Sequence, residues 1–106
     1  MSSRTPEVDV AQLAAAVDQG AVVVDVRERG EYAQVHVPGA VLIPMGQLTA
    51  RMGELDKTAP VYVVCATGNR SSAMTDLLRA AGFEAYSVSG GTQAWVASGR
   101  AVGVGL

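Results

Sequence analysis

The sequence contains one cysteine and one histidine. The cysteine, Cys65, has no second cysteine with which to form a disulfide within the chain. Together with the histidine, His36, it cannot complete the ligand set of a structural zinc site. We therefore expect a fold that is stabilised by its hydrophobic core, without a structural metal.

Basic charge, aromatic side chains and long apolar runs are also scarce. Ten Asp and Glu residues outnumber eight Lys and Arg residues, which gives a formal net charge of −2, and aromatic residues make up 5% of the chain. Because nucleic-acid binding needs clustered basic charge, we expect no nucleic-acid partner. No run approaches the ~18 apolar residues of a membrane helix, and residues 1–6 lack the apolar stretch of a signal peptide. We expect a cytoplasmic protein with no membrane partner.

The composition that remains is typical of a compact globular domain. Hydrophobic residues make up 49% of the chain and charged residues 17%. A length of 106 residues fits one domain with a single core. We predict one domain over residues 1–106, with loosely held ends at 1–6 and 100–106.

Short β-branched runs alternate along the chain with stretches of helical periodicity. The runs at 21–24 and 61–64 show no polar alternation, which is typical of strands buried on both faces of a parallel sheet. Shorter strands are predicted at 8–10, 40–43 and 85–88, and apolar spacing predicts helices at 10–17, 45–55, 73–81 and 92–98. Asp9 and Gln12 fit a capping box at the first helix. This alternation indicates an α/β fold with a mostly parallel sheet and helices on both faces.

The stretch from 61 to 72 contains the residues best suited to carry out a reaction. Cys65 directly follows a predicted buried strand, and a loop with Gly68 leads from it into a predicted helix. Backbone N–H groups at a helix start stabilise an anion, so a thiol held there ionises more readily than a free one. Arg70 can either bind an anion in this loop or pair with a carboxylate that fixes the loop. A buried cysteine acting as a small hydrophobic residue fits the same pattern, so the residues alone leave both roles open.

Three segments together resemble the rhodanese family of sulfurtransferases. Residues 25–44 contain DVRE, EY, HVPGA and IP, residues 65–71 read CATGNRS, and Gly90-Gly91 is followed by Trp95 and Gly99. The resemblance implies a five-stranded, mostly parallel sheet with helices on both faces. It also implies that Cys65 accepts a sulfane sulfur as a persulfide and passes it to a thiol or cyanide.

The same resemblance implies the other parts of the site. The substrate-binding loop comprises Ala66, Thr67, Gly68, Asn69 and Arg70. The implied partners are a small sulfur donor (thiosulfate or a persulfide), a thiol or cyanide acceptor and, as a further option, a sulfur-relay protein. No metal and no organic cofactor is implied. The alternative within the family is a non-catalytic module that binds a partner or carries sulfur.

Loop length and loop composition refine this interpretation. Related phosphatases use Cys-x5-Arg, a wider loop that fits a phosphate, whereas this chain has Cys-x4-Arg, which suits a smaller sulfur site. Members that use thiosulfate well often carry Arg or Lys where this chain has Ala66 and Thr67, so we expect thiosulfate to be a poor donor. Val35 stands where the family usually has Gly, and Ala101 where Pro is common.

The remaining marked residues are interpreted as structural. Asp25 and Arg27 are expected to brace the loops at the strand ends, through an ion pair with each other or with Glu31. His36 is expected in a structural turn and Trp95 as a packing anchor for the last helix. Glu31 otherwise fits solvated surface charge. The methionines on apolar stripes, Met45, Met52 and Met74, fit core positions.

Overall fold

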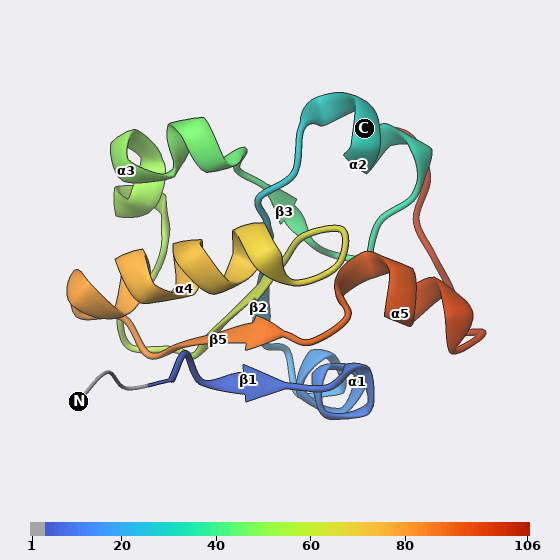
Figure 1. The fold of residues 1–106 in the computed structure, drawn as a ribbon, viewed down its shortest axis with the longest axis horizontal. Coiled ribbons are helices and arrows are strands. Elements are labelled where there is room, and N and C mark those ends of the chain that lie inside the picture. The colour runs from blue at the N-terminus through green and yellow to red at the C-terminus, as the bar shows by residue number, and fades with distance from the viewer. Residues whose placement is uncertain (1–3) are drawn as a thin grey trace.

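A computed structural model describes residues 4–106 of the chain (Figure 1). Five strands form one sheet in the order β1-β5-β4-β2-β3, and every pairing is parallel. This confirms the predicted α/β class. The elements in chain order are β1 (Glu7–Val8), α1 (Val10–Asp18), β2 (Val22–Asp25), α2 (Arg29–Gln34), β3 (Val41–Leu42), η1 (Met45–Gln47), α3 (Leu48–Arg51), η2 (Met52–Glu54), β4 (Val61–Val64), α4 (Asn69–Ala80), β5 (Ala85–Val88) and α5 (Gly91–Ala97).

The sheet register brings two chemically marked positions to one edge. In β2 and β4, Asp25 pairs with Val64, the residue before Cys65. Because both strands run in the same direction, their carboxyl ends open onto the same edge of the sheet, where ligands collect in open parallel sheets. The central strands β2 and β4 are built from almost continuous valine, as expected for strands covered on both faces.

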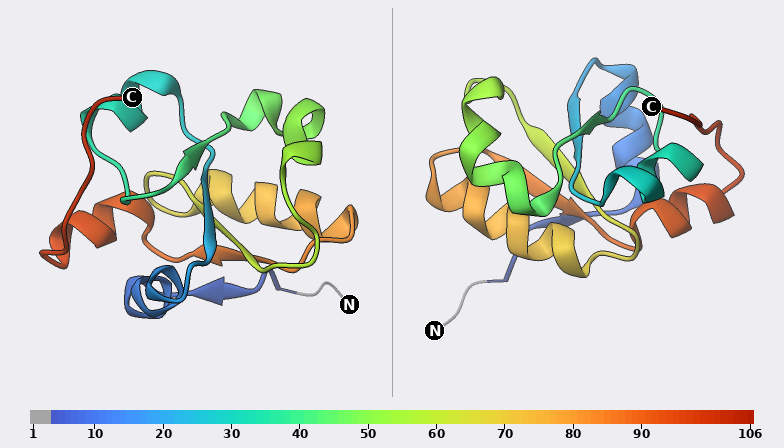
Figure 2. Two further views of the ribbon diagram at one scale, coloured as in Figure 1. Left: turned by 180° about the vertical axis from the view of Figure 1, so that it is seen from behind. Right: turned by 90° about the horizontal axis from the view of Figure 1, so that it is seen from above.

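Helices cover both faces of the sheet, and each face has its own core cluster. Seen from above in Figure 2, α3 and α4 lie to one side and α1 and α5 to the other. The α3/α4 side packs on a cluster that includes Leu48, Val63 and Leu78, and the α1/α5 side on one that includes Leu13 and Trp95. Trp95 is only 5% exposed, so the packing role predicted for it is confirmed.

Local signals placed the first helix correctly. The Asp9 side chain accepts a hydrogen bond from the Gln12 amide at 2.8 Å, and the Gln12 side chain accepts one from the Asp9 amide at 2.9 Å. This reciprocal pair satisfies two amides that the first turn of a helix leaves without an intrahelical partner.

The prediction of one helix over 45–55 was wrong. The segment instead forms the short helices η1, α3 and η2, and Met45 is 40% exposed rather than in the core. Gly46 and Gly53 lie within it, and glycine lowers helix stability by about 1 kcal/mol relative to alanine. The sequence patterns also missed α2, because none of its six residues is buried and so it shows no apolar periodicity.

The chain end from 100 to 106 is held in place, in contrast to the loose tail that we expected. Gly103 exchanges two backbone hydrogen bonds with His36, at 2.9 and 2.8 Å, and the Gly105 amide donates to the Ala33 carbonyl at 2.7 Å. Figure 1 accordingly shows the C-terminus beside α2. The expectation of a loose start falls partly on residues 1–3, which lie outside the described residues, while Pro6 accepts a hydrogen bond from the Ser87 amide.

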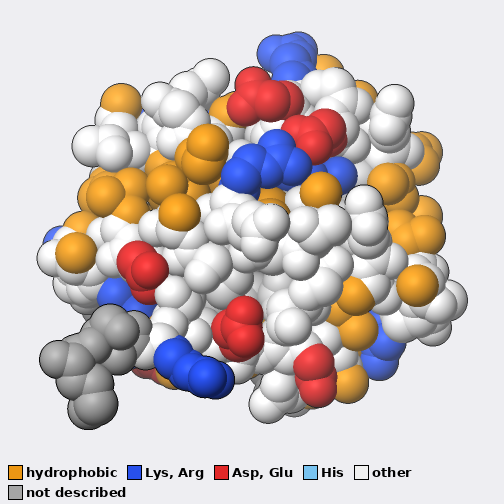
Figure 3. Space-filling model, in the orientation of Figure 1, with side chains coloured by type: hydrophobic (Ala, Val, Ile, Leu, Met, Phe, Trp, Pro, Cys, Tyr) orange, Lys and Arg blue, Asp and Glu red, His pale blue; other side chains and the backbone are white. Residues whose placement is uncertain are grey.

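Charged side chains are mixed rather than segregated on the face drawn in Figure 3, where acidic and basic groups lie beside each other. Within residues 4–106, each helix is too short or too polar to cross a bilayer.

Candidate active site around Cys65

Cys65 lies at the carboxyl end of β4, with the loop 66–68 folded over its sulfur. The residue is 1% exposed. The Gly68 amide donates a hydrogen bond to Sγ with an N–S distance of 3.1 Å. Gly68 adopts a φ of +121°, a conformation that residues with a Cβ rarely take, so the glycine is what allows this amide to turn back onto the sulfur.

Two buried serine hydroxyls form a hydrogen-bonded chain that begins at the thiol. The Cys65 S–H donates to Ser71 Oγ at 3.4 Å, and Ser71 Oγ lies 2.8 Å from Ser87 Oγ. Ser71 itself donates to the Gly68 carbonyl at 3.1 Å. When Cys65 is ionised, the Ser71 hydroxyl can turn its proton to Sγ while accepting one from Ser87. The hydroxyl pair therefore suits both protonation states of the sulfur.

The environment favours the ionised form of the thiol. Burial acts to raise the pKa of Cys65, but hydrogen bonds from the Ser71 side chain and from the amides of Ser71, Gly68 and Thr67 outweigh it. The net pKa of the thiol therefore lies below its ordinary value. A thiolate held among N–H and O–H donors is a nucleophile, and the same donors stabilise an anion formed on it.

The N-terminus of α5 fixes the backbone of the loop from the far side. The Thr92 amide donates to the Cys65 carbonyl at 2.8 Å and the Gln93 amide to the Ala66 carbonyl at 3.1 Å. Gly91 passes so close that a Cβ added there would lie 2.4 Å from the Cys65 carbonyl oxygen. The Gly-Gly pair at the start of α5 thus permits the close approach that holds the loop.

Arg70 pairs with a carboxylate, which is one of the two roles that the sequence left open. Its guanidinium makes two hydrogen bonds of 2.9 Å to the Glu31 carboxylate. Arg70 lowers the pKa of Glu31 to about 2, so the pair stays ionised at neutral pH. The interpretation of Glu31 as solvated surface charge was therefore wrong. Helix α2 presents Glu31 to the loop, and its ion pair with Arg70 joins α2 to α4.

Asp25 and Arg27 form the ion pair that we expected between them. The Arg27 side chain contacts both carboxylate oxygens of Asp25, the shortest contact being 2.8 Å, and both residues are buried. Arg27 also donates to the Val35 carbonyl at 2.7 Å. The pair thereby ties the end of β2 to the end of α2, and Val35 fits there because its φ of −165° is extended backbone that any residue adopts.

The lone histidine, expected in a structural turn, instead pairs with Gly103 in an isolated antiparallel bridge, and the turn follows at Pro38 and Gly39. His36 Nδ1 lies 2.8 Å from the Tyr32 carbonyl, and its ring stacks on the Tyr32 ring with centroids 3.7 Å apart. Within residues 4–106, no group of three or more His, Cys, Asp or Glu side chains is placed to hold a metal ion. Ala101, where the family often has Pro, accepts a hydrogen bond from the Trp95 indole at 2.9 Å.

The loop residues that the sequence singled out surround the sulfur mainly through backbone. Gly68 and Thr67 contribute amides, while the side chains of Thr67 and Asn69 are exposed. The sequence interpretation gave no role to Ser71 or Ser87. Ser71 was visible in the loop motif, but the approach of Ser87 depends on the pairing of β5 with β4, which the local sequence does not specify.

Comparison with known proteins agrees with this geometry. A family model described as the rhodanese-like domain matches residues 9–98. The chain belongs to the rhodanese-like domain family. A thiosulfate sulfurtransferase, GlpE, of Pseudomonas fluorescens (strain Pf0-1) is 39% identical over 79 residues, which cover 74% of this chain and 72% of GlpE. A crystal structure of a rhodanese-related protein from Thermoplasma volcanium superposes with a TM-score of 0.88 at 29% identity, covering 93% of this chain and 98% of that one.

A longer relative also matches this rhodanese-like domain. YrkF of Bacillus subtilis (strain 168), named as a candidate sulfur carrier, is 33% identical over 85 residues. The match covers 78% of this chain but 46% of YrkF, so the chain spans about half the length of that relative.

Removing the Ser71 hydroxyl from this rhodanese-like domain is expected to raise the pKa of Cys65. The Ser71 hydroxyl can donate a hydrogen bond to the thiolate and so lowers the pKa of the thiol, and Ser71→Ala should therefore move the ionisation midpoint upward. The midpoint is measured from the rate of iodoacetamide alkylation against pH. Ser72→Ala, in which the lost hydroxyl bonds Thr5 and not the sulfur, is the matched control. An unchanged midpoint in Ser71→Ala would contradict the role of the Ser71 hydroxyl in stabilising the Cys65 thiolate.

Proposed function

We propose that this domain is a sulfurtransferase that carries sulfane sulfur as a persulfide on Cys65. The observation that carries the proposal is the thiol held at the end of β4 by the Gly68 amide and the Ser71 hydroxyl, which lower its pKa. The names of the relatives, a thiosulfate sulfurtransferase and a candidate sulfur carrier, support the same chemistry. A reducing, cytoplasmic setting suits a free nucleophilic thiol.

The reaction proceeds in two balanced steps. The Cys65 thiolate attacks the sulfane sulfur of the donor, a new S–S bond forms, and the old bond to sulfur breaks as the leaving group departs with its electron pair. With thiosulfate the leaving group is sulfite, and with a persulfide it is the donor thiolate. An acceptor thiolate or cyanide then attacks the outer sulfur and releases the Cys65 thiolate, which gives ping-pong kinetics. The amides of the loop hold the anionic persulfide between the steps.

Intact mass spectrometry tests the proposal directly. Incubation with a small persulfide donor should add one sulfur atom to the protein, and a thiol acceptor should then remove it. Several donors (a low-molecular-weight persulfide, thiosulfate and polysulfide) should be tried. A protein that gains no sulfur from any of them contradicts the proposal.

A module that binds or carries sulfur without turnover is the second candidate. It is favoured by the pairing of both nearby arginines with carboxylates, which leaves little positive charge for an anionic donor. Multiple turnovers with excess donor and acceptor would support the enzyme. A persulfide that forms once and leaves only in the presence of a partner protein would support the carrier.

Thiosulfate is expected to be a poor donor for this chain. The loop positions after Cys65 are the uncharged Ala66 and Thr67, and the Arg70 charge is neutralised by Glu31 at 2.9 Å. We expect a KM for thiosulfate above ~1 mM, the upper end of the ordinary range. Thr67→Lys places a cation on the exposed rim and should lower that KM about tenfold at low salt.

The control for this prediction is Thr67→Gln, which adds length without charge. Both variants are assayed at low and high salt, because only an electrostatic gain is screened. A low-micromolar KM for thiosulfate in the unmodified protein would contradict the prediction.

A further inference from the structure

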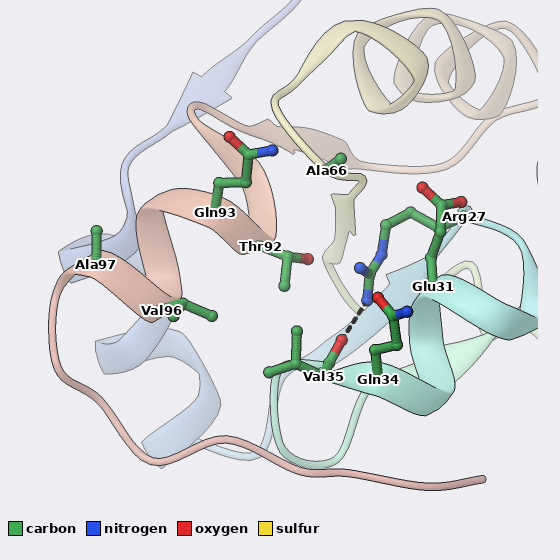
Figure 4. A pocket seen from close by; sticks show the side chains of 9 residues that line it. All are labelled: Arg27, Glu31, Gln34, Val35, Ala66, Thr92, Gln93, Val96 and Ala97. Carbon is green, nitrogen blue, oxygen red and sulfur yellow. Dashed lines mark hydrogen bonds between the residues drawn. The ribbon is translucent and has the colours of Figure 1, made fainter.

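A pocket of about 450 Å³ lies between α2 and α5, beside the loop that covers Cys65 (Figure 4). It borders the loop at Ala66, the residue that follows the cysteine. Its volume falls in the range of about 300–1,000 Å³ that is typical of small-molecule sites, and it is far larger than a sulfur anion requires. The pocket therefore offers room for the body of a molecule whose sulfur reacts at Cys65.

A polar group without a partner lies in the wall of this pocket. Thr92 is 2% exposed, and among residues 4–106 its hydroxyl has no hydrogen-bond partner. In Figure 4 its oxygen points towards the side of the pocket where Ala66 and Arg27 lie. A buried hydroxyl without a partner is destabilising, so a ligand group that bonds it would gain binding free energy.

The other uncharged polar side chains of the pocket are carboxamides. Gln34 of α2 and Gln93 of α5 line it from opposite sides. Each carboxamide offers both a donor and an acceptor, the pattern that complements an amide group of a ligand. Val35 and Val96 add apolar surface between them, which suits the methylene groups of an amide-bearing chain.

Both charged side chains that line the pocket are already paired. Arg27 contacts Asp25 at 2.8 Å, and Glu31 contacts Arg70 at 2.9 Å. A ligand with a carboxylate or sulfonate gains no free cation here, and it brings its own desolvation cost. The chemistry of the pocket therefore favours an uncharged ligand.

We propose that this pocket binds the uncharged, amide-bearing arm of the thiol that exchanges sulfur with Cys65. The proposal rests on the sulfurtransferase function proposed above. Two kinds of thiol carry such an arm. One is a cysteine whose amino and carboxyl groups are both in amide linkage, and the other is a small linear amide that ends in a thiol. The arm lies between α2 and α5, and the sulfur reaches the loop past Ala66.

Binding is measured first with probes that cannot react. N-acetyl-S-methylcysteine methylamide represents the cysteinyl arm, N-acetyl-S-methylcysteamine the linear arm, and N-acetyl-S-methylcysteine the same cysteinyl arm with a free carboxylate. We expect saturable amide NMR shifts at Thr92, Gln93 and Val96 with one or both neutral probes, and affinity weaker by about tenfold for the carboxylate probe. The better of the two neutral probes identifies the source of the arm.

Two variants locate the site. Val96 is 45% exposed, so Val96→Trp should fill the pocket without disturbing the core, and Thr92→Val removes the hydroxyl while keeping the backbone amide. Each should weaken binding of the neutral probe about tenfold. Val102→Trp, at a 42% exposed position outside the pocket lining, is the matched control and should bind as the unmodified protein does.

Reactive thiols then connect binding to sulfur transfer. With the Cys65 persulfide preloaded and verified by mass, Val96→Trp should lower the ratio of the rate with N-acetylcysteine methylamide to the rate with cyanide about tenfold. Three results would overturn the inference: NMR shifts confined to residues outside the pocket, equal affinity for the carboxylate and neutral probes, or a rate ratio that neither Val96→Trp nor Thr92→Val changes. Probe binding at the pocket in a protein that never gains sulfur would leave the site standing and refute the sulfurtransferase function instead.

Discussion

Replacing Cys65 by serine is expected to reduce sulfur transfer on the order of 10³-fold or more, because no other thiol is present to form the persulfide. A serine alkoxide forms only at much higher pH and does not accept sulfane sulfur in a bond that a thiol can reverse. The donor and acceptor rates are measured separately, and intact mass shows whether any sulfur remains bound.

Loss of activity must be separated from loss of fold. Cys65 belongs to the core cluster that includes Val63 and Leu78, while its sulfur faces the Gly68 amide, so a substitution here changes both packing and hydrogen bonding. Cys65→Ala removes the hydrogen-bonding atom altogether and is the matched variant. Both should retain the far-ultraviolet circular dichroism of the unmodified protein and a cooperative thermal transition. Sulfur transfer by either variant within tenfold of the unmodified rate would contradict the role of the thiol.

The residues whose roles follow from local chemistry were predicted well. The runs at 21–24 and 61–64 predicted β2 and β4, two of the interior strands, because successive apolar residues, mostly valine, fit a strand covered on both faces. The Asp9–Gln12 capping box depends on neighbours only three positions apart. The position of Cys65 at the carboxyl edge follows from the same local patterns and from the parallel topology.

The contacts that complete the site depend on distant segments and were not visible locally. Glu31 meets Arg70 across 39 positions of sequence, and Ser87 reaches Ser71 only because β5 pairs beside β4. The helix that carries Glu31 has no buried residue, so it left no periodic signal. The tail was misjudged for a similar reason: its glycines suggested flexibility, while Gly103 is in fact paired with His36.

The two ion pairs of the site, Arg27 with Asp25 and Arg70 with Glu31, explain why its net charge is lower than a count of its arginines suggests. Two arginines near a reactive thiol suggest an anion site, but Arg27 and Arg70 each hold a carboxylate at 2.8 and 2.9 Å. The remaining donors are amides and hydroxyls, which stabilise a single sulfur anion without attracting a dianion from a distance. The poor use of thiosulfate that we predict and the preference for uncharged thiols that we propose would therefore follow from one electrostatic arrangement.

Replacing Gly91 by alanine is expected to be the most destabilising single-methyl change near the loop. An added Cβ would lie 2.4 Å from the Cys65 carbonyl oxygen and 2.6 Å from that of Ala66, and both obstacles are backbone that cannot rotate away. The φ of +57° adds left-handed strain. Because α5 must retreat and lose its hydrogen bonds to the loop, we expect a loss of about 2–4 kcal/mol in the free energy of unfolding.

Gly99→Ala separates the steric contact from the strain of the backbone conformation. Gly99 has a φ of +79°, similar in sign to that of Gly91, but nothing lies within 4 Å of its added Cβ. It should therefore show only the conformational cost, about 1 kcal/mol. In thermal unfolding, Gly91→Ala should lower Tm by roughly 10 °C or more and Gly99→Ala by about half as much or less. Equal shifts in the two variants would mean that the approach of α5 to the Cys65 carbonyl does not constrain the loop.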